Sequence, residues 1–299
     1  MPNWNEISKE IGSSASPLDS IRRKYLKELS DLTGRNTIIY YSGFLQNTEL
    51  SNGEKRHLSV NDNDKTGFMS TIFNMDKSKG LDLILHTPGG DIAATESLVN
   101  YLKAIFGNDI RAIVPQLAMS AGTMISCSCS TIIMGKHSSI GPIDPQLGPY
   151  AAHAIIEEFV SARKDILKEP KSAALWSPII SKYSPTLIGK CQKAISWSEE
   201  IVKNWLISNM LSEHANKEDE ATNIVKYLGS HAMTKSHSRH ISADKAREIG
   251  LNITMLEEDS ALQEAVLSVH HSTIHTLTST KAIKIIENNE GMAYIQSKR

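Results

Sequence analysis

A repeated alternation of short apolar runs and amphipathic stretches constrains this chain more than any other feature of its sequence. Residues 81–86 (LDLILH), 111–114 (RAIV) and 131–134 (TIIM) have the length and composition of buried strands. Segments with apolar residues at helical spacing lie between them, over residues 91–106 and from Met119 towards Cys127. Strand, helix, strand, helix, strand at these distances predicts parallel βαβ units, and therefore an α/β fold.

The sequence on both sides of this region predicts helical additions. Apolar residues recur at helical spacing over residues 17–32, a strand pattern follows at 37–44, and residues 151–211 are mainly helical. We predict an N-terminal helical extension, a central domain and a C-terminal extension that could form oligomer contacts. The expected bounds are residues 1–35, 36–255 and 256–299.

Three further segments carry predictions about local structure. Residues 62–67 (DNDKTG) resemble the start of a calcium loop, but Phe73 stands where that loop needs a bidentate glutamate. We therefore expect a polar turn there, followed by a helix over residues 68–75. Residues 212–220 (SEHANKEDE) predict a charged loop, and the tail from Ser268 is β-like at KAIKII and ambiguous elsewhere.

Composition excludes several classes of function. The formal net charge of the 299 residues is −1, which gives no electrostatic reason to expect nucleic acid or an anionic membrane as a partner. The polar first 20 residues contain no signal sequence, and no uninterrupted apolar run approaches the roughly 18 residues of a membrane span. The three cysteines, without CxxC spacing, are expected in the core of a cytoplasmic protein.

We also expect neither a cofactor nor a metal. The sequence has no P-loop, so an ATPase would have to be a separate partner. The later histidines match no zinc-hydrolase signature and are expected at the surface or at an oligomer interface. These are His231, His237, His240, His270, His271 and His275.

Two turns carry the residues with chemical potential. The strand at 81–86 ends at Pro88-Gly89-Gly90 just before a helix, which exposes backbone N–H groups that can bind an oxyanion. A second strand-to-helix turn carries Ser120, and the N–H group of Ala121 after it is another donor. In a parallel sheet both turns lie at the carboxyl edge of the strands, where α/β proteins bind ligands. The alternative role for Ser120 is a helix N-cap.

The residues around these turns resemble a known group of peptidases. Residues 83–92 (LILHTPGGDI) and 118–123 (AMSAGT) are similar to the paired motifs of the Clp proteolytic subunit and signal peptide peptidase A, and residues 138–143 (SSIGPI) resemble a later signal peptide peptidase segment. The strongest similarity is to the serine dehydrogenase proteinase family, from about Asp19 to the C-terminal KIIEN. The resemblance implies a Clp-protease/crotonase-like spiral of ββα units, serine endopeptidase activity on peptides or proteins, and a homo-oligomer.

The resemblance makes Ser120 the nucleophile and Gly89, Gly90 and Ala121 the oxyanion hole, but it leaves the base open. Asp144 stands about where a Clp-type triad has its histidine, and we expect this aspartate to be a structural acceptor. A Ser-Lys dyad with Lys171 is therefore our prediction, with burial near Leu175 and Trp176 lowering the pKa of that lysine. Reserve candidates are Lys182, Lys164, Lys168 and His137, whereas His86 is expected in the core.

Two other functions use the same fold. A crotonase-type acyl-CoA enzyme also needs two backbone donors, but we find no basic cluster for the CoA phosphates. A catalytically silent oligomeric scaffold would keep the fold without the chemistry.

Overall fold

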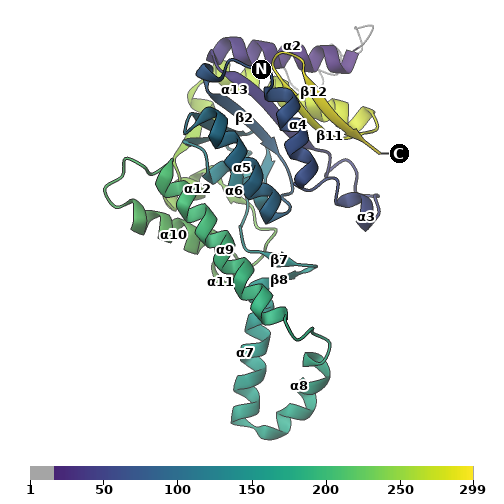
Figure 1. Ribbon diagram of the computed structural model, residues 1–299, viewed down its shortest axis with the longest axis vertical. Helices are drawn as coiled ribbons and strands as arrows, with labels where there is room; N and C mark the ends of the chain where they lie inside the picture. Colours follow the sequence, from purple (N-terminus) through teal and green to yellow (C-terminus); the bar gives the residue numbers. More distant parts are fainter. Residues whose placement is uncertain (1–16, 299) are drawn as a thin grey trace.

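The computed structural model describes residues 17–298 and is built around one twisted sheet of seven strands (Figure 1). The strand order is β10-β5-β3-β2-β1-β11-β12. The five strands from β10 to β1 run parallel, and the last two pair antiparallel. The bounds are β1 Asn36–Ser42, β2 Leu81–His86, β3 Ile110–Val114, β5 Thr131–Met134, β10 Ile253–Met255, β11 Ala282–Asn288 and β12 Ala293–Ser297.

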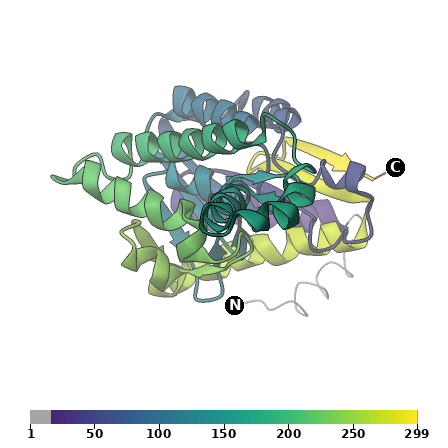
Figure 2. The same cartoon turned by 90° about the horizontal axis from the view of Figure 1, so that it is seen from below.

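Both faces of this sheet are covered by helices, because the side chains of its central strands are apolar in both directions. In β1, Ile38 and Tyr40 face one core while Ile39 and Tyr41 face the other. Figure 2 shows α4 and α5 on one side of the sheet and α13 on the other. The helices packed on the two faces are α4 (Asp62–Ile72), α5 (Ile92–Phe106) and α6 (Ala121–Cys127), opposite α2 (Pro17–Thr33) and α13 (Ser260–Ser279).

A second, three-stranded sheet lies beyond the carboxyl ends of β3 and β5. Its order is β4-β6-β9, with β4 at Leu117–Ala118, β6 at Ser139–Ile140 and β9 at Ile241–Ser242. Strand β4 follows β3 and strand β6 follows β5, so these two strands of the main sheet each lead into a short strand of the small one. The predicted mixed α/β class with a mostly parallel sheet is confirmed, whereas a spiral of ββα units stays a prediction.

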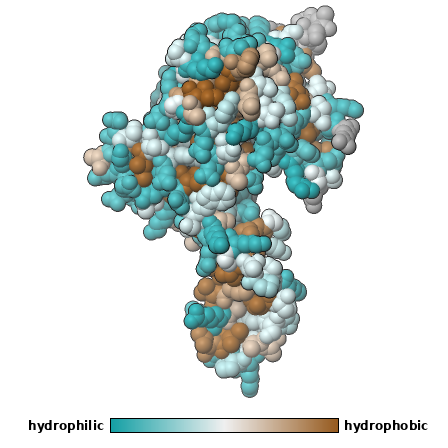
Figure 3. Space-filling model, viewed as in Figure 1, coloured by the Kyte–Doolittle hydropathy of each residue, from teal (hydrophilic) through white to brown (hydrophobic). Residues whose placement is uncertain are grey.

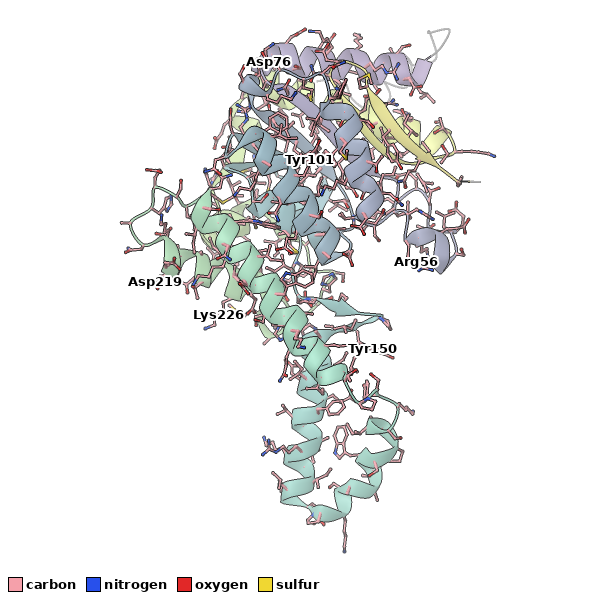
Figure 4. All side chains as sticks on the ribbon, viewed as in Figure 1. Arg56, Asp76, Tyr101, Tyr150, Asp219 and Lys226 are labelled. Carbon is pink, nitrogen blue, oxygen red and sulfur yellow. The ribbon has the colours of Figure 1, made fainter. Side chains whose placement is uncertain are left out.

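A helical arm projects from this body (Figure 1). It is formed by α7 (Ala152–Lys168), η2 (Pro170–Ser172), α8 (Ala173–Ile180) and the first part of α9 (Leu187–Ser208). At its base lies a hairpin of β7 (Gln146–Leu147) and β8 (Tyr150–Ala151), whose Tyr150 projects beside the root of the arm (Figure 4). The arm carries exposed apolar side chains, seen as brown areas in Figure 3, including Leu167 and Leu175.

Several local predictions need correction. Helix α4 begins at Asp62, not at residue 68, because Asn61 and Asp64 form a capping box there. Helix α10 (Lys217–Gly229) begins inside the predicted charged loop. The residues 268–279, left ambiguous, belong to α13. The predicted division at residues 35 and 255 stays a prediction; α13, β11 and β12 lie after residue 255, and residues 1–16 lie outside the described part.

The remaining described elements are short. They are α3 (Asn52–Lys55), η1 (Lys77–Lys79), α11 (His231–Thr234), α12 (Ala243–Glu248) and η3 (Leu256–Glu258). Within residues 17–298, no helix combines the length and apolar character needed to cross a membrane. The cysteines Cys127, Cys129 and Cys191 are buried and free, as predicted for core residues.

Candidate active site

The two predicted turns lie against each other at the carboxyl edge of the main sheet. Thr87 N–H donates to the carbonyl of Leu117 over 3.0 Å, and Met119 N–H donates to the carbonyl of Thr87 over 3.0 Å. Gly89 has φ +97°, and a Cβ atom there would lie 2.5 Å from the Cβ atom of Ser120. Glycine is therefore required at this position for two reasons: its φ is positive, and the turn that carries Ser120 approaches it closely.

Ser120 has a strained backbone. Its φ of 51° and ψ of −112° lie outside the backbone regions that residues other than glycine prefer. It stands at the N-cap of α6, yet its side chain makes no capping hydrogen bond. A capping role therefore does not explain this serine. Its backbone conformation costs about 1–3 kcal/mol, yet its hydroxyl group makes no hydrogen bond to the helix end.

The backbone donors beside Ser120 differ in their availability. Gly89 N–H donates to the Thr87 Oγ1 atom over 3.2 Å, so its hydrogen bond is already used. The N–H groups of Gly90 and Ala121 have no acceptor among the described residues. Of the three predicted oxyanion-hole residues, Gly90 and Ala121 therefore have N–H groups without an acceptor in the described chain, Ala121 being itself buried, and Gly89 shapes the turn.

A cavity of about 340 Å³ brings Ser120 together with Gly89 and Gly90. Residues from the start of α5, from α6, from the segment before β7 and from α9 line it. Its apolar lining includes Met124, Ile143 and Trp197, and its polar lining includes Gln146 and His237. The cavity therefore offers an apolar wall beside the hydroxyl group of Ser120 and the imidazole of His237.

His237 is bound to a buried aspartate. Its Nδ1 atom lies 2.8 Å from Oδ1 of Asp144, whose side chain is fully buried, while 29% of the His237 side chain is exposed. Gln146 Nε2 donates to the other carboxylate oxygen of Asp144 over 3.0 Å. An Nδ1–H bond to the carboxylate leaves Nε2 as the basic nitrogen, the arrangement that a general base beside a serine requires.

The structure does not bring the predicted lysines to Ser120 within one chain. Lys171 lies in η2 on the arm, is exposed, and is absent from the lining of the cavity. The burial expected near Leu175 is also missing, because the Leu175 side chain is itself 75% exposed. The reserve lysines are likewise exposed on the arm: Lys164 and Lys168 on α7, and Lys182 after α8.

The other candidate histidines lie away from the cavity lining. His137 is exposed in the turn after β5, and His86 is buried at the end of β2 as expected. Burial lowers the pKa of His86 to about 3, which leaves this imidazole neutral at physiological pH. No group of three or more metal-binding side chains arises among residues 17–298.

His237 is the candidate base that the sequence alone does not single out. Nothing in its local sequence distinguishes it from the other late histidines, and its place in the chain does not fit the Clp order of serine, histidine and aspartate. The order Ser120, Asp144, His237 is instead that of α/β-hydrolases, in which the acid precedes the histidine. This order is the feature of the sequence that points to His237 as a base.

Comparison with known proteins gives consistent results. The sequence model of the family described as ClpP-like SDH-type serine proteinase matches residues 18–260. Uncharacterized protein MJ0137 of Methanocaldococcus jannaschii is 30% identical over 236 residues, covering 79% of this chain and 74% of that protein. Uncharacterized protein MJ1495 of the same organism is 31% identical over 173 residues, covering 58% of this chain and 51% of that protein. The matched residues 18–260 include Ser120, Asp144 and His237.

Proposed function

Since the chain belongs to the family of ClpP-like SDH-type serine proteinases, we propose that it hydrolyses peptide bonds through an acyl-enzyme on Ser120. One observation carries the proposal: the strained Ser120 and the Asp144-bound His237 line the same cavity. The predicted nucleophile is kept, and His237 replaces Lys171 as the favoured base.

The proposed reaction follows from the roles of these groups. Ser120 Oγ attacks the peptide carbonyl carbon while its proton passes to Nε2 of His237. The negative oxygen accepts hydrogen bonds from the N–H groups of Gly90 and Ala121. The protonated His237, stabilised by Asp144, then donates its proton to the leaving amine, and the C–N bond breaks. Water, activated by the same histidine, next cleaves the ester and releases the acid.

The lining of the cavity supports peptide substrates with an apolar side chain next to the cleaved bond. Met124, Ile143 and Trp197 offer apolar surface, and burying one such side chain supplies about 1.5–3 kcal/mol. We expect the rate of cleavage of short fluorogenic peptides to fall when leucine or methionine at that position is replaced by aspartate.

Labelling with a fluorophosphonate probe, followed by mass spectrometry to locate the adduct, tests the nucleophile and the base together. We expect an adduct on Ser120 that is lost in Ser120→Ala and strongly reduced in His237→Ala. The matched control is His240→Ala, because His240 is an exposed histidine near His237 that does not line the cavity. Normal labelling of His237→Ala would contradict the proposed base.

The same experiment separates the alternatives. Loss of the adduct in Lys171→Ala alone would favour a Ser-Lys dyad in which the arm of one chain reaches the Ser120 site of another. An unlabelled but folded and assembled wild-type protein would favour the silent scaffold. Saturable binding of CoA thioesters, with no adduct on Ser120, would favour a crotonase-type enzyme.

We also propose that the chain works as a cytoplasmic homo-oligomer. The exposed apolar side chains of the arm, including Val160, Leu167 and Leu175, would be covered by another copy. Light scattering with size-exclusion chromatography measures the mass. Replacing Leu167 and Leu175 by glutamate should lower it, and a monomer in the wild type would contradict the proposal.

A further inference from the structure

A buried ion pair is linked through the segment around Val60 to residues 87–90, which we call the oxyanion turn. Lys284 on β11 is fully buried, and its Nζ atom lies 2.7 Å and 3.0 Å from the carboxylate oxygens of Asp64 on α4. Asp64 also accepts hydrogen bonds from the hydroxyl group of Tyr40 over 2.7 Å and from the N–H of Asn61 over 3.0 Å. The carboxylate is thus fixed by three donors from three parts of the chain.

Lys284 also fixes the segment that precedes α4. Its Nζ atom donates to the carbonyl oxygen of Ser59 over 2.8 Å. Asn61 is held by Asp64 through its N–H group, so the residues on both sides of Val60 are tied to the same ion pair. Val60 itself is buried.

Val60 in turn holds the oxyanion turn. Its N–H donates to the carbonyl of Gly89 over 2.8 Å, and its carbonyl accepts the N–H of Asp91 over 2.9 Å. Val60 and Gly90 form a parallel β-bridge, and a Cβ atom on Gly90 would lie 2.3 Å from the Val60 backbone. Because the groups of an extended backbone alternate in direction, this pairing turns the N–H of Gly90 away from Val60.

We propose that Lys284 and Asp64 are positioning residues, which hold the N–H group of Gly90 where the oxyanion forms. The inference rests on the proposed peptidase function and adds a requirement to it. A purely stabilising role explains the pair poorly, because replacing a buried ion pair with apolar residues of similar volume often leaves stability unchanged or raises it. What such residues cannot replace is the donor to the Ser59 carbonyl.

The test uses the full-length chain with both partners replaced. Lys284→Met alone would leave the Asp64 charge buried and could prevent folding, so the main variant combines Lys284→Met with Asp64→Asn. The matched control combines Arg22→Met with Glu287→Gln. Arg22 and Glu287 form another fully buried ion pair, and Glu287 lies on the same strand as Lys284 but on its opposite face.

Two reactions distinguish the oxyanion hole from the nucleophile. Hydrolysis of an apolar p-nitrophenyl ester needs the oxyanion hole, and we expect kcat to fall about 10–100-fold with little change in KM. In a Ser120→Cys background, alkylation by iodoacetamide forms no oxyanion, and its rate should stay within about twofold of that of Ser120→Cys alone. The control pair should change neither reaction.

Each other result decides against the inference. A wild-type kcat in the Lys284 and Asp64 variant would show that the pair is not needed for positioning. An equal loss of ester hydrolysis and alkylation, or an equal loss in the control, would show general damage to the fold. A wild-type protein with no esterase activity and no adduct on Ser120 would refute the proposed function itself, and this inference with it.

Discussion

Lowering the pH should destabilise this protein through His86, and the size of the effect can be worked out from the site. The His86 ring contacts the rings of Tyr41 and Phe44, with centroid distances of 5.3 Å and 5.0 Å. Neither ring nitrogen has a hydrogen-bond partner among residues 17–298. Burial lowers the pKa of His86 from 6.5 to about 3.

The sign follows from linkage between protonation and folding. Between these two pKa values the unfolded chain binds a proton at His86 and the folded chain does not, so stability is lost as the pH falls below 6.5. Each pH unit within this window is worth about 1.4 kcal/mol, so a change from pH 7 to pH 5 removes about 2 kcal/mol through His86. His270, whose pKa is also lowered by burial, adds to the loss in the same direction.

The perturbation is His86→Met, a change of similar volume that removes the titrating group. Urea unfolding, followed by tryptophan fluorescence at one chain concentration, gives the free energy of unfolding at pH 7 and pH 5. The variant should lose about 2 kcal/mol less than the wild type between these two pH values. The effect of the substitution on packing is nearly the same at both pH values, so it largely cancels in this comparison. His57→Phe, at an exposed position, is the control.

Equal losses in the wild type and in His86→Met, to within about 0.5 kcal/mol, would refute the reasoning about burial. They would mean that the imidazole of His86 finds water or a partner in solution and is not forced to be neutral. Because His86 directly precedes the oxyanion turn, its protonation should also reduce labelling of Ser120 before the protein unfolds.

The other predictions concern the site itself. Ser120→Gly should be about 1 kcal/mol more stable than Ser120→Ala in urea unfolding, because glycine accepts φ 51° without strain; equal stability would argue against a strained serine. Asp144→Asn should lower kcat about 10³–10⁴-fold by disturbing the His237 tautomer, and a loss under tenfold would leave Asp144 a structural acceptor. Gly89→Ala should abolish fluorophosphonate labelling while the protein stays folded, since its methyl group would meet Ser120; retained labelling would contradict the close approach of the turns.

The sheet and the two turns could be predicted because their signals are local. The strands at 81–86, 111–114 and 131–134 are short apolar runs whose ends are marked by glycine, polar residues or the start of a helix. Once they are read as parallel strands, topology alone brings the turns at Gly89 and Ser120 to one edge of the sheet. The proposed base lacks such a local signal, because His237 comes from a loop that follows the arm and two further helices.

Helix α13 escaped prediction for a different physical reason. Its buried face mixes apolar residues such as Val266, Val269 and Leu277 with serine, threonine and histidine, so its apolar stripe is interrupted by polar residues. These hydroxyl groups donate to carbonyl groups of the same helix, as Thr273 does to Val269 over 2.7 Å and Thr276 does to Ser272 over 3.0 Å. A polar residue satisfied within its own helix can be buried, and hydrophobic periodicity cannot detect it.

The strain at Ser120 also explains why three separated sequence motifs occur together. A residue stays in such a conformation only if its surroundings over-determine it. Thr123 Oγ1 donates to the carbonyl of Ala118 over 2.9 Å and accepts the N–H of Gly141 over 2.9 Å, so the Ser-Ile-Gly segment closes the serine turn from one side. Gly89 closes it from the other side, where there is no room for a side chain. The glycine turn and the Ser-Ile-Gly segment thus do more than accompany the nucleophile, because together they hold Ser120 in a conformation that it would otherwise leave.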